Sequence, residues 1–283
     1  MTANSVNSNN KKNDVASKLA AKNNTFSKRF VRLTKSLQFY WFLGHAITLF
    51  ASFIYFFTFS FKQSWYRIAF FGALQSFGVL IYQQQFLSKS TTSKPAASEE
   101  VQILEYENIL YFILALTWIS TPKLSIALVP YIAFSTLHFS SYLQSTLLPK
   151  LFPGATADKV SSYISKFHEC YNEKSMYWVA SGELLIECIL ILRALLFFPK
   201  SWIVLIIYSL FLKVKFELSK YSTTVFAQWR VIFDGIISHP MVPPQIKKAY
   251  NFIKLNLISL SNFKLIRYLN IPIPIQDEKK KEN

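Results

Sequence analysis

Three charged residues lie inside one long apolar run, Met176 to Phe198. Glu183 and Glu187 are four residues apart, so a helix places both carboxylates on one face, and Arg193 follows farther along. Charges inside a bilayer are costly, and they mark either ion and proton paths or pairs between neighbouring helices. Both alternatives are open for these three side chains on the sequence alone.

The histidines carry a weaker signal for chemistry. His138 lies in a serine-rich segment, where a helix would place it in a polar seam between helices together with Ser135, Ser140 and Ser141. The four histidines and two cysteines show no metal-ligand spacing, and with six glycines the chain has no phosphate-binding loop or nucleophile elbow. The sequence therefore predicts no metal, no cofactor and no enzymatic activity.

The elements that must position these side chains are apolar helices. The 283 residues are 52% hydrophobic and 17% aromatic, and the mean hydropathy is +0.24, which is typical of a membrane protein. A bilayer core of about 30 Å needs roughly 20 apolar residues in a helix. The uncharged stretches between Lys35 and Lys62 and between Arg67 and Lys89 meet that length, and they are the first two predicted spans.

Two more hairpins follow along the chain. The turn at residues 121–123 separates the predicted helices Leu104–Thr121 and Leu124–Leu147, and the turn at 199–201 separates Met176–Phe198 from Trp202–Leu212. The last of these four segments is short for a full span. The predicted fold is all-α: a polytopic α-helical membrane protein built from helical hairpins, with cytosolic amphipathic helices at the carboxyl end.

The distribution of charge predicts the orientation of these hairpins. Eight of the first 35 residues are basic and one is acidic, so the positive-inside rule places the leader in the cytosol. Three hairpins then put their short turns in the lumen and both termini in the cytosol. The predicted organisation is a basic leader (1–35), a membrane domain (36–212), amphipathic interfacial helices (213–270) and a charged tail (271–283).

The carboxyl region is apolar and basic at once. On a helical period Ile246, Tyr250, Ile253 and Leu257 share one stripe, while lysines lie beside it. The charges leave no run long enough to span, which favours a helix lying in the membrane interface. Of 31 basic residues six are arginine, and this lysine bias, next to apolar runs, favours anionic lipid over nucleic acid as the partner.

A second amphipathic helix is predicted over residues 218–240, with an i,i+4 pair between Arg230 and Asp234. His239 and Pro240 would end it, and Pro243 and Pro244 suit the start of the next helix. The terminal Lys280 and Lys281 look like a dilysine retrieval signal of endoplasmic-reticulum membrane proteins.

Three segments carry a resemblance to a known family: the run beginning "LEYENILYFILALTWISTPK", then "SGELLIECILIL", then the run ending "VFAQWRVIFDGIISHPMVPP". Together they resemble the transmembrane protein 33 family, which includes fungal pore-membrane and perinuclear endoplasmic-reticulum proteins. The similarity covers residues 37–244. Its most specific positions are Leu137, His138, Glu183, Ile236, Ile237 and Pro240.

The resemblance implies a non-enzymatic protein of the endoplasmic reticulum and nuclear envelope. It would shape or stabilise curved membrane and contribute to nuclear pore complex assembly or distribution, with reticulon-type proteins, nucleoporins and an importin as partners. The alternative is a small-solute or ion transporter using Glu183 and Glu187. The residues expected to contact the membrane surface or an importin are Lys247, Lys248, Lys254, Lys264, Arg267, Tyr250, Ile253 and Leu257.

Overall fold

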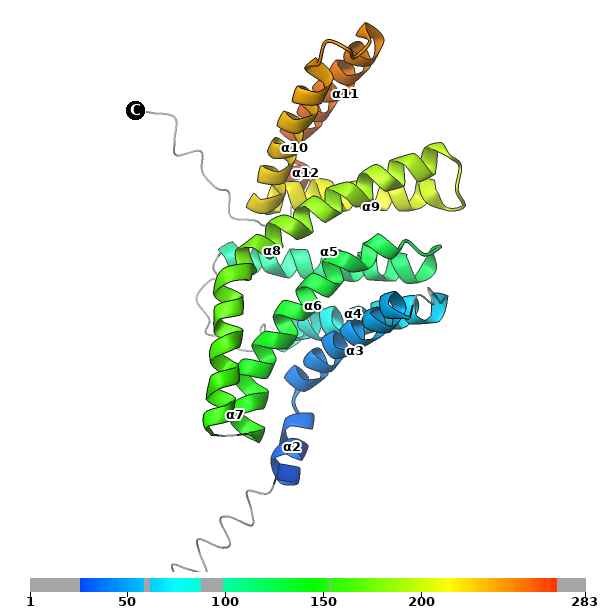
Figure 1. The fold of residues 1–283 in the computed structure, drawn as a ribbon. Coiled ribbons are helices and arrows are strands. Elements are labelled where there is room, and N and C mark those ends of the chain that lie inside the picture. The colour runs from blue at the N-terminus through cyan, green and yellow to red at the C-terminus, as the bar shows by residue number, and fades with distance from the viewer. Residues whose placement is uncertain (1–25, 59–61, 88–98, 153, 269–283) are drawn as a thin grey trace, which may run out of the picture.

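The computed structural model describes residues 26–58, 62–87, 99–152 and 154–268, and within these ranges every regular element is a helix (Figure 1). The predicted all-α class is therefore confirmed. The leader up to residue 25, the tail from residue 269 and the predicted retrieval signal at Lys280 and Lys281 lie outside the described residues.

The first hairpin joins α3 (Leu37–Phe57) to α4 (Gln63–Tyr82), which continues as a π-helical turn (Gln83–Leu87). A short helix, α2 (Phe26–Thr34), precedes them. The side chain of Ser36 accepts a hydrogen bond of 3.2 Å from the backbone N–H of Phe39 and so caps α3.

The two helices of this hairpin cross at backbone contact. A Cβ atom at Gly44 would lie 2.6 Å from the carbonyl oxygen of Gly72. The Thr48 hydroxyl donates to the carbonyl oxygen of Ala69 at 3.1 Å, and that of Ser76 donates to the carbonyl oxygen of Trp41 at 3.0 Å. Small residues with hydrogen-bonding hydroxyls are the usual means of close helix packing in membranes.

The second hairpin joins α5 (Glu99–Ser120) to α6 (Leu128–Tyr142) through a 3₁₀ turn (Ser125–Ala127). A π-helical turn (Leu143–Leu147) and α7 (Leu148–Leu151) extend α6. The third joins α8 (Ala155–Leu195) to α9 (Ser201–Leu218). The predicted helix Met176–Phe198 is only the second part of α8, which begins 21 residues earlier and runs without interruption for 41 residues.

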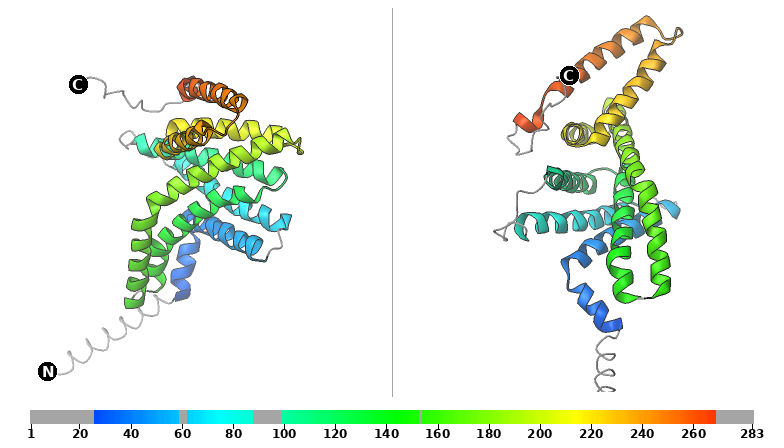
Figure 2. Two further views of the ribbon diagram at one scale, coloured as in Figure 1. Left: turned by 45° about the horizontal axis from the view of Figure 1, so that its top comes forward. Right: turned by 90° about the vertical axis from the view of Figure 1, so that its left-hand side faces the viewer.

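The three hairpins form two layers. One layer contains α3, α6 and α8, and the other contains α4, α5 and α9, as the right-hand view of Figure 2 shows. Each hairpin contributes one helix to each layer. The buried core between and within the layers is rich in aromatic side chains, including Tyr55, Tyr66, Phe70, Tyr111, Trp118 and Tyr208.

The hairpin turns lie together at one side of the molecule (Figure 1). Tyr55 and Ser125 are joined by a hydrogen bond of 2.7 Å between their hydroxyls, and the backbone N–H of Leu124 donates to the Tyr66 hydroxyl at 3.3 Å. The Arg193 guanidinium donates to the carbonyl oxygen of Lys123 at 3.5 Å. This arrangement agrees with turns on a common side, whereas the assignment of that side to the lumen stays a prediction.

Three helical stretches of the described residues are long and apolar enough to cross a membrane: Leu37–Phe57, Ile103–Ser120 and Ser125–Leu151. They match the first, third and fourth predicted spans. The remaining predicted spans, in α4, α8 and α9, are not among these candidates and stay predictions. Polar residues lie within or next to them: Gln75 lies inside the span in α4, and Lys213 and Lys215 follow the predicted span in α9.

The carboxyl end leaves the bundle as a pair of helices. α10 (Lys220–Ser238) packs on α8 and α9 through its first half, α11 (Pro244–Asn262) returns along it, and α12 (Leu265–Tyr268) contacts α9. Figure 2 shows α10 and α11 projecting from the layers as a hairpin. The predicted boundaries at Pro240 and Pro244 are confirmed.

Candidate functional site

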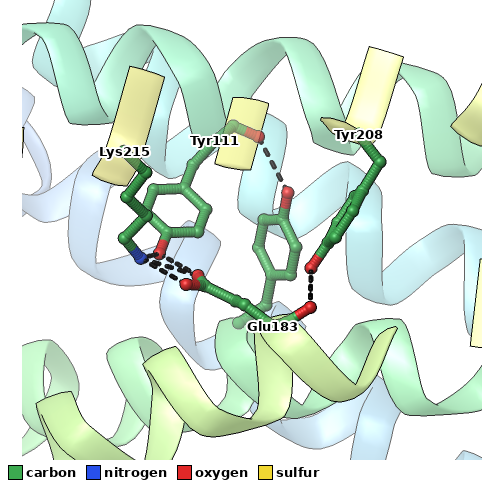
Figure 3. A network of polar contacts seen from close by, with 5 residues as sticks. Tyr111, Glu183, Tyr208 and Lys215 are labelled. Carbon is green, nitrogen blue, oxygen red and sulfur yellow. Dashed lines mark hydrogen bonds and ion pairs between the residues drawn. The ribbon is translucent and has the colours of Figure 1, made fainter. Parts of the chain in front are cut away.

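A buried ion pair joins α8 to α9. The Nζ atom of Lys215 lies 2.7 Å from each carboxylate oxygen of Glu183, and both residues are almost fully buried (Figure 3). The Tyr111 hydroxyl, from α5, donates to the Glu183 carboxylate and accepts from the Lys215 ammonium. The Lys215 ammonium also lies 4.7 Å from the centroid of the Tyr111 ring.

Two further tyrosines hold the backbone around this pair. The Tyr208 hydroxyl donates to the carbonyl oxygen of Glu183 at 3.1 Å, and the Tyr131 hydroxyl donates to the carbonyl oxygen of Tyr111 at 2.9 Å. Tyr131 comes from α6, Tyr111 from α5 and Tyr208 from α9. Four helices from both layers therefore meet at one set of polar contacts, which we call the ion-pair cluster.

The ion-pair cluster gives Glu183 a partner on a neighbouring helix. A carboxylate removed from water is strongly destabilising unless a counter-charge and hydrogen-bond donors replace the lost hydration. Lys215 and Tyr111 supply both, so Glu183 is paired across helices. Lys215 lies beyond the predicted span, so the sequence alone did not single it out as a partner of Glu183. The spacing Lys213-x-Lys215 could have indicated it, because residues two apart on a helix point in nearly opposite directions and one of the two lysines must face inward.

The other charged residues of the same run do not join the cluster. Glu187 accepts a hydrogen bond of 2.6 Å from the Ser209 hydroxyl, and its second carboxylate oxygen is buried without a hydrogen-bond partner among the described residues. Arg193 lies at the turn end, over the ring of Phe198 at 5.2 Å. The three charges of the run therefore lie in three different environments.

The predicted polar seam around His138 exists with different partners. His45, which the sequence did not single out, is buried, and its Nδ1 atom lies 3.0 Å from the Ser135 hydroxyl. The Ser140 hydroxyl lies 3.0 Å from Nε2 of His168. His138 itself packs its ring against His45 and Trp41, with centroids 5.0 Å and 5.3 Å away. The seam links α3, α6 and α8.

The carboxyl-terminal hairpin is held by an acidic residue of α10. Asp234 accepts hydrogen bonds from the Lys254 ammonium at 2.6 Å and from the Tyr250 hydroxyl at 2.8 Å. These two hydrogen bonds, Lys254 first, lower the pKa of Asp234. Desolvation, followed by the hydrogen bond to Asp234, raises the pKa of Tyr250. Arg230, the predicted partner, also lowers the pKa of Asp234 through its charge, but the hydrogen bonds to the carboxylate come from the facing helix.

The polar contacts of α11 point toward α10, which leaves its apolar residues outside. Lys247 donates to the carbonyl oxygen of Ser238 at 3.3 Å, on the same side as Tyr250 and Lys254. Four residues at helical spacing are exposed, and we call them the apolar stripe of α11: Ile246, Ile253, Leu257 and Leu260. This hairpin is therefore inverted relative to a soluble one, with polar contacts inside and apolar surface outside.

The other residues expected to contact the membrane surface or an importin differ in their environment. Lys248 and Lys264 are exposed, while the side chain of Arg267 lies outside the described part. The amino terminus of α12 is capped by a side chain of another helix. The Glu217 carboxylate of α9 accepts from the backbone N–H groups of Leu265 and Ile266 at 2.9 Å and 3.1 Å. A helix amino terminus favours a negative charge, so a side chain distant in sequence replaces the local cap.

The hairpin layers, the buried ion-pair cluster and the candidate spans define a polytopic all-α membrane protein. The chain belongs to the transmembrane protein 33/nucleoporin POM33 family, whose model matches residues 20–261. The resemblance seen in the sequence is thereby confirmed.

Three relatives show how far the similarity extends. The chain is 42% identical to pore membrane protein of 33 kDa from Saccharomyces cerevisiae, over 87% of this chain and 91% of the relative. It is 31% identical to nucleoporin POM33 from Chaetomium thermophilum, over 81% and 87%. It is 28% identical to tetra-spanning protein 1 from Schizosaccharomyces pombe, over 80% and 85%. No solved structure matches the chain.

Proposed function

We propose that the chain is a non-enzymatic membrane protein of the nuclear envelope and endoplasmic reticulum that acts at nuclear pore complexes by binding curved membrane with its carboxyl-terminal hairpin. The observation that carries this proposal is the exposed apolar stripe of α11, in a region that also exposes Lys248 and Lys264. The names of the relatives, pore membrane protein and nucleoporin, supply the link to the pore.

The mechanism follows from the inverted hairpin. Lys254 and Tyr250 hold α11 to Asp234, and the apolar stripe, which borders Tyr250, stays exposed beside this contact. An interfacial helix buries such a stripe about 5–10 Å into the headgroup boundary. Lys248 and Lys264 remain exposed for anionic headgroups, each worth about 1 kcal/mol near the surface. Wedging one leaflet in this way favours curved bilayer. An importin is the proposed competitor for the same lysines.

The buried ion pair supports a structural role for the bundle and not transport. In the transport alternative, Glu183 and Glu187 would have to exchange a proton or an ion during a cycle, yet Glu183 is held by Lys215 and Tyr111. Replacing Glu187 by glutamine keeps the bond from Ser209 and removes the charge. Normal pore distribution with Glu187→Gln supports the structural role, and loss of function in a correctly localised protein supports transport.

The curved-membrane proposal is tested by the position of the full-length tagged protein in cells. The variant Ile253→Asp/Leu257→Asp places two charges on the apolar stripe and should change punctate nuclear-rim labelling to a uniform distribution in the reticulum. The matched control Asn251→Asp/Ser259→Asp adds the same charge at exposed positions outside the stripe and should keep the puncta. Puncta that survive the stripe substitutions at normal protein level contradict the proposal.

A further inference from the structure

A row of five apolar side chains, four of them aromatic, lies exposed along α8 from its first half to just past its middle. Val160, Tyr163, Phe167 and Tyr171 are three or four residues apart, and Trp178 follows two turns later on the same face. Tyr163, Tyr171 and Trp178 are 73%, 53% and 80% exposed. We call these five residues the aromatic stripe of α8.

The aromatic stripe is not the face with which α8 packs in the bundle. That face makes polar contacts with α6 and its extension: Ser140 to His168, and the Gln144 amide to the Ser165 hydroxyl at 2.6 Å. Farther along, the same packing face carries Glu183 and the buried Ile186. The aromatic stripe lies to one side of it and is left without a covering element in the described part of the chain.

The length of α8 shows that only part of it fits in the hydrocarbon core. Its 41 residues extend about 61 Å at 1.5 Å per residue, roughly twice the 30 Å core. The ion-pair cluster fixes the second half within the bundle. The first half carries charged side chains such as Lys159, Lys166 and Glu169, which keep it out of the hydrocarbon.

The first half of α8 runs in a different direction from its second half. Figure 1 shows α8 bending near its middle, so that its first half runs across the direction of α3, α4 and α9. The face of the aromatic stripe continues past Trp178 to Leu185 and Leu192, which are also exposed. The face of the aromatic stripe, interrupted by Lys174, thus continues onto exposed apolar residues of the second half of α8.

We propose that the first half of α8 lies in the headgroup region of the bilayer, with the aromatic stripe at the boundary of the hydrocarbon. Tyrosine and tryptophan prefer this depth, because the rings enter the apolar layer while their polar groups reach water. Phe167 and Tyr171 pack together with ring centroids 5.3 Å apart, and the Lys174 ammonium lies 5.9 Å from the Tyr171 ring. A lysine beside an interfacial ring can reach the lipid phosphates with its ammonium group while its aliphatic part stays near the hydrocarbon.

This proposal adds a second interfacial element that does not depend on the carboxyl-terminal hairpin. It is tested on the full-length protein after replacement of Cys170 and Cys188 by serine, in vesicles of phosphatidylcholine and phosphatidylserine. A single cysteine at Tyr163 or Tyr171 carries an environment-sensitive fluorophore. Ser162→Cys and Glu169→Cys are matched controls, because both positions are exposed on the opposite face of the same turns.

The expected result is that nitroxide-labelled lipids quench the stripe labels several-fold more than the control labels, while aqueous iodide quenches the controls more. Equal iodide quenching at Tyr163 and Ser162 overturns the proposal and leaves the stripe as a surface for a protein partner. Adding Ile253→Asp/Leu257→Asp separates the two interfacial elements. Lipid quenching at Tyr163 should survive it, whatever the outcome for α11.

Discussion

Replacing Lys215 by methionine removes the counter-charge of Glu183 while keeping most of the side-chain volume. Glu183 then loses two contacts of 2.7 Å and keeps, among the described residues, only Tyr111 as a donor to its side chain. Breaking a buried pair by removing one partner typically costs about 3–5 kcal/mol. On a scale of roughly 2–4 °C per kcal/mol for chains of this size class, the midpoint of thermal unfolding should fall by about 10 °C.

The assay is thermal unfolding of the full chain in detergent micelles or nanodiscs, followed by tryptophan fluorescence at several pH values. A double-mutant cycle with Glu183→Met provides the control, because replacing both members by apolar residues leaves no buried charge and is often nearly neutral. The double variant should therefore be more stable than Lys215→Met alone. The Glu183–Lys215 pairing is refuted if Lys215→Met alone lowers the free energy of unfolding by less than about 1 kcal/mol. It is also refuted if the loss of stability in the double variant equals the sum of the losses in the two single variants.

Three other predictions concern the remaining contacts. Gly72→Val should destabilise the α3–α4 crossing by about 1–3 kcal/mol, seen in the same unfolding assay, because its new atoms meet the backbone of Gly44. Asp234→Asn should broaden the α10–α11 distance distribution between spin labels, whereas Arg230→Ala should leave it narrow. Burial of Glu217 raises its pKa, but hydrogen bonds from Lys213 and the α12 backbone outweigh this, so its pKa is lowered from 4.5. The stabilisation of α12 is therefore full above about pH 4.5 and is lost as pH falls through the lower folded value. A spin label attached at Tyr268→Cys, in a chain without the two native cysteines, should become mobile on acidification; unchanged mobility would contradict the capping role.

Much of the architecture follows from uncharged length and turn residues. The spans at Leu37–Phe57, Ile103–Ser120 and Ser125–Leu151 follow from apolar runs of sufficient length, and the ends of α10 and α11 follow from prolines. The first half of α8 is absent from the predicted helices, because its charges leave no apolar run of sufficient length. Charges exclude a span, yet they do not exclude a helix that lies outside the hydrocarbon.

The candidate sites show a similar division. Glu183 was identified because a carboxylate in an apolar run is conspicuous, but its partner Lys215 lies 32 positions away on another helix. Asp234 is a second case, because helical spacing predicts the local partner Arg230 and does not reveal Lys254. Glu217 is a third case, because it caps α12 from a different helix. Partners across helices depend on packing, and periodicity within one helix does not contain that information.

The buried ion pair also constrains how the chain enters the membrane during synthesis. Tyr111 precedes Glu183 by 72 positions, whereas Lys215 follows it by 32. When α8 leaves the ribosome its carboxylate has a hydroxyl donor available but no cation. The ion pair can therefore form only after α9 has been synthesised, which favours insertion of α8 and α9 as one hairpin.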